Sequence, residues 1–211
     1  MHILQSRCLF VYPYWIADEK YISYCACKAT CWYHSGHLQY AYIQMYMAYT
    51  GCLDIADTTI SNSPLKTKDG ADVLKSESVF KFKNCTIKTL NVLNDYTDLI
   101  GLYFYSCKLF DEAGNSAVAI PELPGLLHFG ITDTEGMQKL KIGTSADTKS
   151  IYVTSNPDLT TIELPNSAKL KYLDLSGNKN LNAIANPEIL SKMSELESIN
   201  IRGTALTSLT W

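Results

Sequence analysis

LKYLDLSGNKNLNAI, residues 170–184, carries the spacing that organises most of this chain, LxxLxLxxNxxL. On an extended backbone Leu173 and Leu175 point to one face, and Asp174 points to the other. Asn178 falls where the chain must bend, and its amide can bond main-chain groups that a bend leaves unpaired. One such turn cannot close a core, so the pattern predicts that neighbouring turns of the same spacing stack on it.

The same spacing recurs from residue 50 to residue 211. Each unit keeps apolar residues at its fourth and sixth positions and Asn, Cys or Thr at its ninth. The seven units begin at residues 50, 77, 99, 126, 148, 170 and 196. The intervals between these starts are 27, 22, 27, 22, 22 and 26 residues, within the range of solenoid repeats. We therefore predict a repeat array of about seven units over residues 50–211.

These units resemble leucine-rich repeats. The segments LDLSGNKNL and VTSNPDLTTIEL are most similar to surface-associated leucine-rich repeat proteins of gut and oral bacteria. The resemblance implies an α/β fold: a right-handed leucine-rich repeat solenoid with a parallel concave β-sheet and a mixed helical and extended convex side. It also implies a non-enzymatic binding module, secreted or located at the cell surface.

The convex side is expected to include a short helix after Asn186. Asn186 suits an N-cap, Pro187 the first helical position and Glu188 the first turn. Units such as residues 148–169 have room only for an extended return. We therefore expect helical and extended returns to be mixed.

Residues 1–49 differ in kind and hold nine of the 14 tyrosines. We predict that they form an N-terminal cap or a divergent first repeat, with a helix over residues 38–49. Five side chains of metal-ligand type are crowded here: Cys25, Cys27, Cys31, His34 and His37. A zinc site, a disulfide such as Cys31 with Cys52, and ordinary buried thiols all fit them. We predict no metal or cofactor, because zinc ligands normally come as two separated pairs.

The composition excludes several classes of partner. A net charge of −3 with 18% charged residues argues against a dedicated binder of nucleic acid. No apolar run reaches the ~20 residues needed to span a bilayer, so no membrane insertion is expected. Residues 8–17 imitate a signal peptide weakly and contain Pro13, so no clear export signal is predicted.

The candidate binding patch lies on the concave side of the predicted sheet. The residues between the two buried strand positions are Asp54, Lys81, Tyr103, Gly130, Tyr152, Asp174 and Asn200. Tyr103 and Tyr152 should stand roughly 10 Å apart, with a gap at Gly130 that could hold a peptide side chain or a sugar ring. The predicted ligand-binding residues are Tyr103, Tyr105, His128, Gly130, Tyr152, Tyr172 and Asp174. Alternatively, the tyrosines merely cover the sheet.

These observations favour a binding module without catalytic residues. His128 has no acid or cysteine placed beside it by the spacing, and is expected at the surface rather than as a general base. The expected partner is a protein, and a glycan also fits the patch. The alternative is a structural or assembly protein that associates through the Tyr-rich start and the uncapped C-terminal edge after Leu209.

Overall fold

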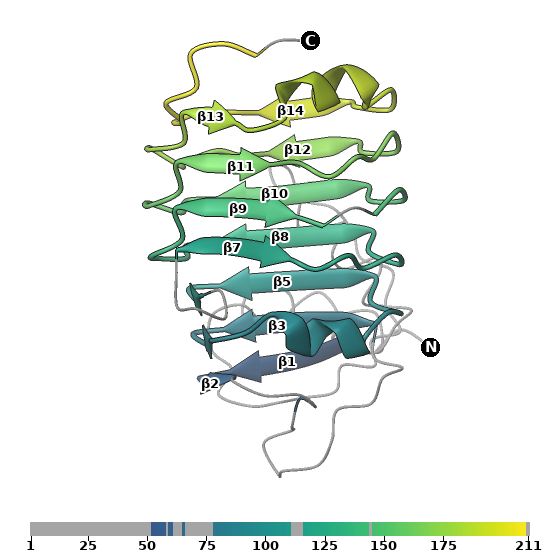
Figure 1. The fold of residues 1–211 in the computed structure, drawn as a ribbon, viewed down its shortest axis with the longest axis vertical. Coiled ribbons are helices and arrows are strands. Elements are labelled where there is room, and N and C mark those ends of the chain that lie inside the picture. Colours follow the sequence, from purple (N-terminus) through teal and green to yellow (C-terminus); the bar gives the residue numbers. More distant parts are fainter. Residues whose placement is uncertain are drawn as a thin grey trace, which may run out of the picture.

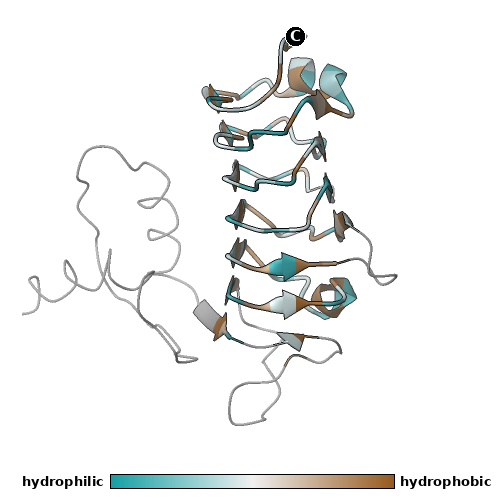
Figure 2. Ribbon diagram, turned by 90° about the vertical axis from the view of Figure 1, so that its left-hand side faces the viewer, coloured by the Kyte–Doolittle hydropathy of each residue, from teal (hydrophilic) through white to brown (hydrophobic). Residues whose placement is uncertain are grey.

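The computed structural model describes residues 52–57, 59–60, 65, 78–110, 116–143 and 145–209. These residues form a solenoid of parallel strands, with coils stacked in a nearly straight column (Figures 1 and 2). The predicted cap, residues 1–49, lies outside the described residues, as do its helix and its Cys/His cluster.

Each repeat unit supplies one strand to a parallel sheet of seven strands. In sheet order these are β1 (Cys52–Ala56), β3 (Val79–Lys83), β5 (Gly101–Tyr105), β8 (His128–Thr132), β10 (Ser150–Thr154), β12 (Tyr172–Asp174) and β14 (Ser198–Asn200). The first residues of successive strands are paired, from Cys52 with Val79 to Tyr172 with Ser198. These pairings are separated by the predicted repeat lengths, so the structure confirms the repeat frame.

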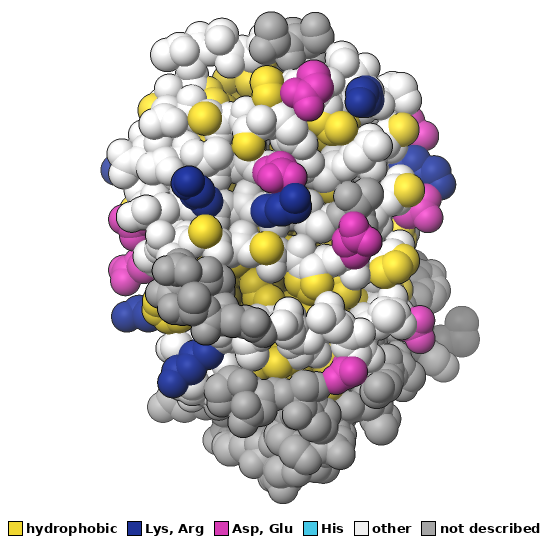
Figure 3. Space-filling view, in the orientation of Figure 1, with side chains coloured by type: hydrophobic (Ala, Val, Ile, Leu, Met, Phe, Trp, Pro, Cys, Tyr) yellow, Lys and Arg dark blue, Asp and Glu magenta, His cyan; other side chains and the backbone are white. Residues whose placement is uncertain are grey.

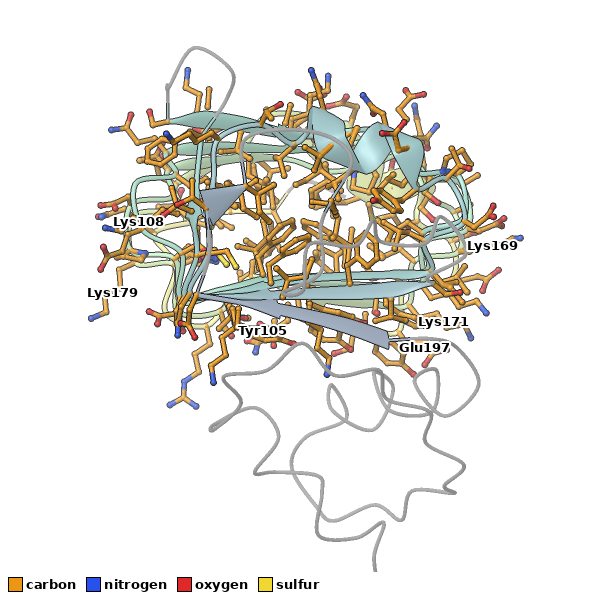
Figure 4. All side chains as sticks on the ribbon, turned by 90° about the horizontal axis from the view of Figure 1, so that it is seen from below. Tyr105, Lys108, Lys169, Lys171, Lys179 and Glu197 are labelled. Carbon is orange, nitrogen blue, oxygen red and sulfur yellow. The ribbon has the colours of Figure 1, made fainter. Side chains whose placement is uncertain are left out.

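Two smaller parallel sheets form the rest of the wall. The four-stranded sheet contains β7 (Ala117–Ile120), β9 (Lys139–Ile142), β11 (Thr161–Glu163) and β13 (Ala183–Ile184). The three-stranded sheet contains β2 (Thr59–Ile60), β4 (Thr86–Ile87) and β6 (Lys108–Leu109). The side chains between these sheets and the seven-stranded sheet fill the interior (Figure 4).

In the units that begin at residues 77 to 170, the fourth and sixth residues form the core. In β3 and β5, for example, Phe80, Phe82, Leu102 and Phe104 are at most 1% exposed. Phe82 and Phe104 stack across adjacent strands, with ring centroids 5.2 Å apart and planes 11° apart. Burying each such side chain contributes roughly 1.5–3 kcal/mol, so the stack of coils is held mainly by these rows.

The helical part of the predicted convex side is not supported. The described residues contain no α-helix and two short 3-10 helices, η1 (Asn91–Asp95) and η2 (Pro187–Lys192). Asn186 does not cap η2 with its side chain, because that amide bonds both the N–H and the C=O of Leu164 in the previous coil, at 3.0 and 2.8 Å. No helix in this part of the chain is long and apolar enough to cross a membrane.

Each coil leaves the seven-stranded sheet through a left-handed corner. The corner residues have positive φ: Asp57, Asn84, Ser106, Asp133, Ser155, Gly177 and Gly203. Gly, Asn and Asp suit this position because they tolerate left-handed backbone better than other residues do. Ser106 and Ser155 adopt it as well. At Gly177 an added Cβ would lie 2.9 Å from Ser155 Oγ, so this corner also requires a small residue.

After the corner the chain bends into the core, and polar side chains hydrogen-bond the buried main-chain groups of this bend. These side chains stack from coil to coil, and we call them the polar ladder. Asn178 donates from Nδ2 to the carbonyls of Val153 and Leu175, both at 2.7 Å, and its Oδ1 accepts the N–H of Asn156 at 2.8 Å. Asn156 in turn accepts the N–H of Thr134 at 3.0 Å. The predicted role of Asn178 at the bend is therefore confirmed.

Cysteine replaces asparagine in the earlier coils. Cys107 Sγ lies 3.4 Å from the carbonyl oxygens of both Phe82 and Tyr105, which are alternative acceptors for its single S–H. Cys85 Sγ lies in the same way 3.4 and 3.3 Å from the carbonyl oxygens of Ile55 and Lys83. These buried thiols act as weak local donors at the ninth position of their units, where the repeat pattern has Asn, Cys or Thr.

Replacing Asn178 by Ala should destabilise the fold by about 3 kcal/mol, because three buried main-chain groups lose their partner at once. Asn180 is the matched control, since its exposed amide makes one bond, to the Pro157 carbonyl at 2.7 Å. Asn180→Ala should cost below about 0.5 kcal/mol. Urea unfolding followed by circular dichroism measures both, and equal losses would contradict the ladder.

Candidate functional site

The outer face is the face of the seven-stranded sheet that points away from the core. Lateral strand pairing arranges its side chains in rows. The first row is Val79, Gly101, His128, Ser150, Tyr172 and Ser198; the second is Lys81, Tyr103, Gly130, Tyr152, Asp174 and Asn200; the third is Lys83, Tyr105, Thr132 and Thr154. The second row is the predicted one; the backbone of Asp54, the remaining predicted member, pairs in register with that of Lys81. Strand pairing thus brings all seven predicted site residues onto adjacent strands.

Tyr103 fills the predicted gap at Gly130. An added Cβ on Gly130 would lie 2.8 Å from Tyr103 Cδ1, and one on Gly101 would lie 3.1 Å from Tyr103 Cε2. The ring therefore rests between two glycine positions. Tyr103 is 2% exposed and Tyr152 is 5% exposed. The two rings do not stand on either side of an open slot, because the Tyr103 ring takes up that space.

Tyr105 and Tyr172 are more accessible than Tyr103 and Tyr152, since both are half-buried. Tyr105 stacks on Tyr103 with centroids 6.4 Å and planes 15° apart. Figure 4 shows Tyr105 toward the carboxyl ends of the strands and Lys171 with Glu197 toward the amino ends. The outer face thus presents an aromatic group at each end of its strands.

Tyr172 is oriented by a charged pair that the sequence analysis did not find. Its hydroxyl donates to Glu197 Oε2 at 2.9 Å, and Lys171 Nζ donates to Glu197 Oε1 at 2.9 Å. Hydrogen bonds from Lys171 and then Tyr172 lower the pKa of this exposed carboxyl. The pair spans adjacent coils, so only the strand register identifies it.

Asp174 is half-buried and its carboxylate is engaged within the sheet. Oδ1 accepts the N–H of Ser176 at 2.8 Å, and Oδ2 accepts Asn200 Nδ2 at 3.2 Å. A ligand at this position would therefore meet a carboxylate that is already held in place by its neighbours.

His128 is buried, at 1% exposure, so its expected place at the surface is wrong. Its Nδ1 lies 2.6 Å from the hydroxyl of Ser150, which is fully buried and was not predicted as a site residue. Burial, and to a lesser extent the charge of Lys149, lowers the pKa of His128 from 6.5 to about 4. The imidazole is neutral at pH 7. Although serine and histidine can act together in acyl transfer, a substrate would have to reach both, and this pair is enclosed.

The opposite side of the molecule, formed by the four-stranded sheet, exposes lysines and small residues rather than tyrosines. The four-stranded sheet exposes Lys139 and Lys141 beside small residues such as Ala117 and Ala119. Lys141 pairs with Glu163 at 2.8 Å. Figure 3 shows charged side chains scattered over this side and apolar side chains in a band across its middle. The aromatic residues of the candidate site are confined to the outer face of the other sheet.

Among the described residues, the two buried cysteines are the soft donors that bear on metal binding. Within the described residues no three His, Cys, Asp or Glu side chains come together as ligands. Cys85 and Cys107 are buried free thiols, and a hydrogen bond between them, together with burial, raises the pKa of Cys107. A raised thiol pKa disfavours the thiolate that a soft metal would need.

No protein-family model matches the sequence, and no curated protein is significantly similar to it. The class of the protein therefore follows from its own geometry: it is a parallel-strand β-solenoid.

Gly130→Ala should destabilise the fold by about 1–2 kcal/mol, because the new methyl group displaces the Tyr103 ring. In a Tyr103→Ala background the same substitution should cost at least about 1 kcal/mol less, since no ring opposes it. Urea unfolding of the four proteins measures this coupling. Additive losses would show that the ring does not rest on Gly130.

Acid should destabilise the protein through His128. Because its pKa is lowered in the folded state, its contribution is fully present above about pH 6.5 and is lost as the pH falls toward 4. The full loss corresponds to about 3 kcal/mol. We expect the stability of wild type to fall more steeply over this range than that of His128→Gln, in urea unfolding at several pH values. Parallel pH profiles would contradict a buried neutral imidazole.

Proposed function

We propose that the coils are leucine-rich repeats of the type found in bacterial surface-associated proteins. The LxxLxLxxN order of residues 170–178 supports this assignment, as does the buried amide of Asn178. The replacement of Asn by Cys at Cys85 and Cys107 fits the same repeat class.

We further propose that the protein is a non-enzymatic module that binds another protein through the outer face. The observation that carries this proposal is that the two half-buried tyrosines, Tyr105 and Tyr172, lie on the same face of one rigid parallel sheet. Tyrosine is enriched at protein interfaces, because its ring buries a large apolar area and its hydroxyl gives direction.

The rigidity of the sheet supports this function. Each strand of the face except the two outermost is hydrogen-bonded to a strand on both sides. Tyr105 is further held by its stacking on Tyr103, and Tyr172 by its hydroxyl bond to Glu197. Side chains held in this way lose little conformational entropy when a partner binds, so more of the contact energy appears as affinity.

A polypeptide is the partner that this face suits best. The half-buried rings of Tyr105 and Tyr172 can serve as anchors, and polar groups such as Thr154 and Asp174 lie between them. Anchoring rings surrounded by polar contacts are typical of protein recognition. A glycan ligand is the alternative, for which the engaged carboxylate of Asp174 would accept hydroxyl donors.

The test is to select short random peptides by display on the purified protein and to measure their affinity by interferometry. Peptides bound to the outer face should lose roughly tenfold or more in affinity for Tyr105→Ala/Tyr172→Ala, the loss expected when anchors are removed. Lys139→Ala/Lys141→Ala, on the opposite side, is the matched control and should bind unchanged. Equal affinity for the tyrosine variant would refute the proposal, and binding of glycans but no peptides would favour the alternative.

A further inference from the structure

A line of residues runs along the amino ends of the strands, directly before the first row of the outer face. Main-chain hydrogen bonds of 2.8 or 2.9 Å join its members from coil to coil, with the carbonyl of each accepting the N–H of the next. The members are Ile100, Leu127, Lys149, Lys171 and Glu197, and we call them the amino rim. Glu197 is exposed and the other four are half-buried. Along the column the amino rim thus changes from apolar to cationic and then to acidic.

The two lysines of the amino rim differ in their ion pairing. Lys171 Nζ lies 2.9 Å from Glu197 Oε1, so its charge is matched. Asp147, two residues before Lys149, is paired with Lys169. In the part of the chain that the structure describes, no carboxylate lies within ion-pair distance of Lys149. Lys149 is therefore a half-buried cation without a matching carboxylate.

Lys149 lies close to one of the anchoring rings of the outer face. It directly precedes Ser150, which pairs with Tyr172 in the next strand. Burial, and after it the charge of Lys149, lowers the pKa of His128, so this charge acts on the first row of the face. Adjacent strands are ~4.8 Å apart, so a ligand group bound to Lys149 lies within one coil of the half-buried Tyr172.

A carboxylate is the ligand group that fits Lys149. An ammonium group that is partly removed from water binds best to an ionised acceptor, because a charge-assisted hydrogen bond is about twice as strong as a neutral one. The preceding members of the amino rim, Leu127 and Ile100, offer apolar contacts ~4.8 and ~9.6 Å away. On one side of an extended peptide, residues two apart are separated by ~6.6 Å, which falls between these distances. An acidic and an apolar side chain at that spacing therefore match the amino rim.

We propose that the polypeptide bound by the outer face carries an aspartate or glutamate side chain that pairs with Lys149, two residues from an apolar side chain that packs on Leu127 and Ile100. The peptide then runs across the coils along the amino rim, and Tyr172 packs on the other side of the acidic residue. This specificity rests on the proposed function of the outer face and adds the charge of the partner to it. Because the whole chain has a net charge of −3, the attraction is local to Lys149.

Random peptides selected by display on the purified protein test this specificity. Those that depend on Tyr105 and Tyr172 should be enriched in Asp or Glu two positions from an apolar residue. Lys149→Ala should weaken their binding about fivefold in interferometry, the loss expected for one half-buried ion pair. Lys179→Ala is the matched control, because it removes the same charge from an exposed turn away from the amino rim and should bind unchanged (Figure 4). Circular dichroism should show both variants folded.

Changing the acid of a selected peptide to its amide shows whether the contact with Lys149 is direct. Asparagine for aspartate, or glutamine for glutamate, should cost about fivefold against wild type and nothing further against Lys149→Ala, because both changes remove the same ion pair. Additive losses would overturn the pairing. So would a peptide that loses its affinity only when its C-terminus is amidated, since the terminal carboxylate would then be the bound group.

The outcomes separate this specificity from the proposed function. Peptides that depend on Tyr105 and Tyr172 but show no enrichment in acids, or no effect of Lys149→Ala, would overturn the specificity and leave the proposed function intact. A selection that yields no peptide dependent on the two tyrosines would overturn both.

Discussion

The fold depends on hydrogen bonds to the buried main-chain groups of the bend that follows each strand of the seven-stranded sheet. A turn that enters the interior carries main-chain N–H and C=O groups away from water, and leaving them unpaired costs more than the packing there gains. Asn178 pairs three of these groups. Its Nδ2 donates to one carbonyl in its own coil and to one in the coil before it, and its Oδ1 accepts the N–H of Asn156. Each coil is thus completed by its neighbour. Because these hydrogen bonds join adjacent coils, they fix the register in which neighbouring strands pair.

That constraint explains why the register was predictable and the returns were not. A residue such as Leu173 can be recognised because its burial is imposed by the strand on either side, so the spacing repeats. The return segments differ in length and in secondary structure from coil to coil, so their residues do not repeat at one spacing. Asn186, Pro187 and Glu188 have the residue types of a helix start, yet the amide of Asn186 is used by Leu164 in the preceding coil, and the segment becomes a 3-10 helix. A sequence pattern for capping does not reveal that a competing partner exists one coil away.

The candidate site was predictable as a set of positions but not as a surface. Alternation along the strands placed Tyr103, Gly130 and Tyr152 in one row, because strand geometry leaves no other arrangement. Whether a glycine leaves a gap depends on the rotamer of its neighbour, and the Tyr103 ring lies over Gly130 instead of standing upright. His128 shows the same limit, since its burial and its contact with Ser150 arise between coils 22 residues apart. No local signal in the sequence carries that information.

Inward and outward positions of the coils are consequently under different constraints. An inward residue must match the coils on both sides, so a change at Leu173 affects the packing of the two adjacent coils. An outward residue does not pack between the inward rows, so it is not bound by the volume of the core. Gly101 and Gly130 flank Tyr103 as a local adjustment of this kind, made to one large ring. The coil of β14 follows the same rule: Ile199 and Ile201 are inward residues whose neighbouring coil among the described residues is that of β12, and they are half-buried. Leu173 and Leu175, in the coil of β12, have a described coil on both sides and are at most 1% exposed.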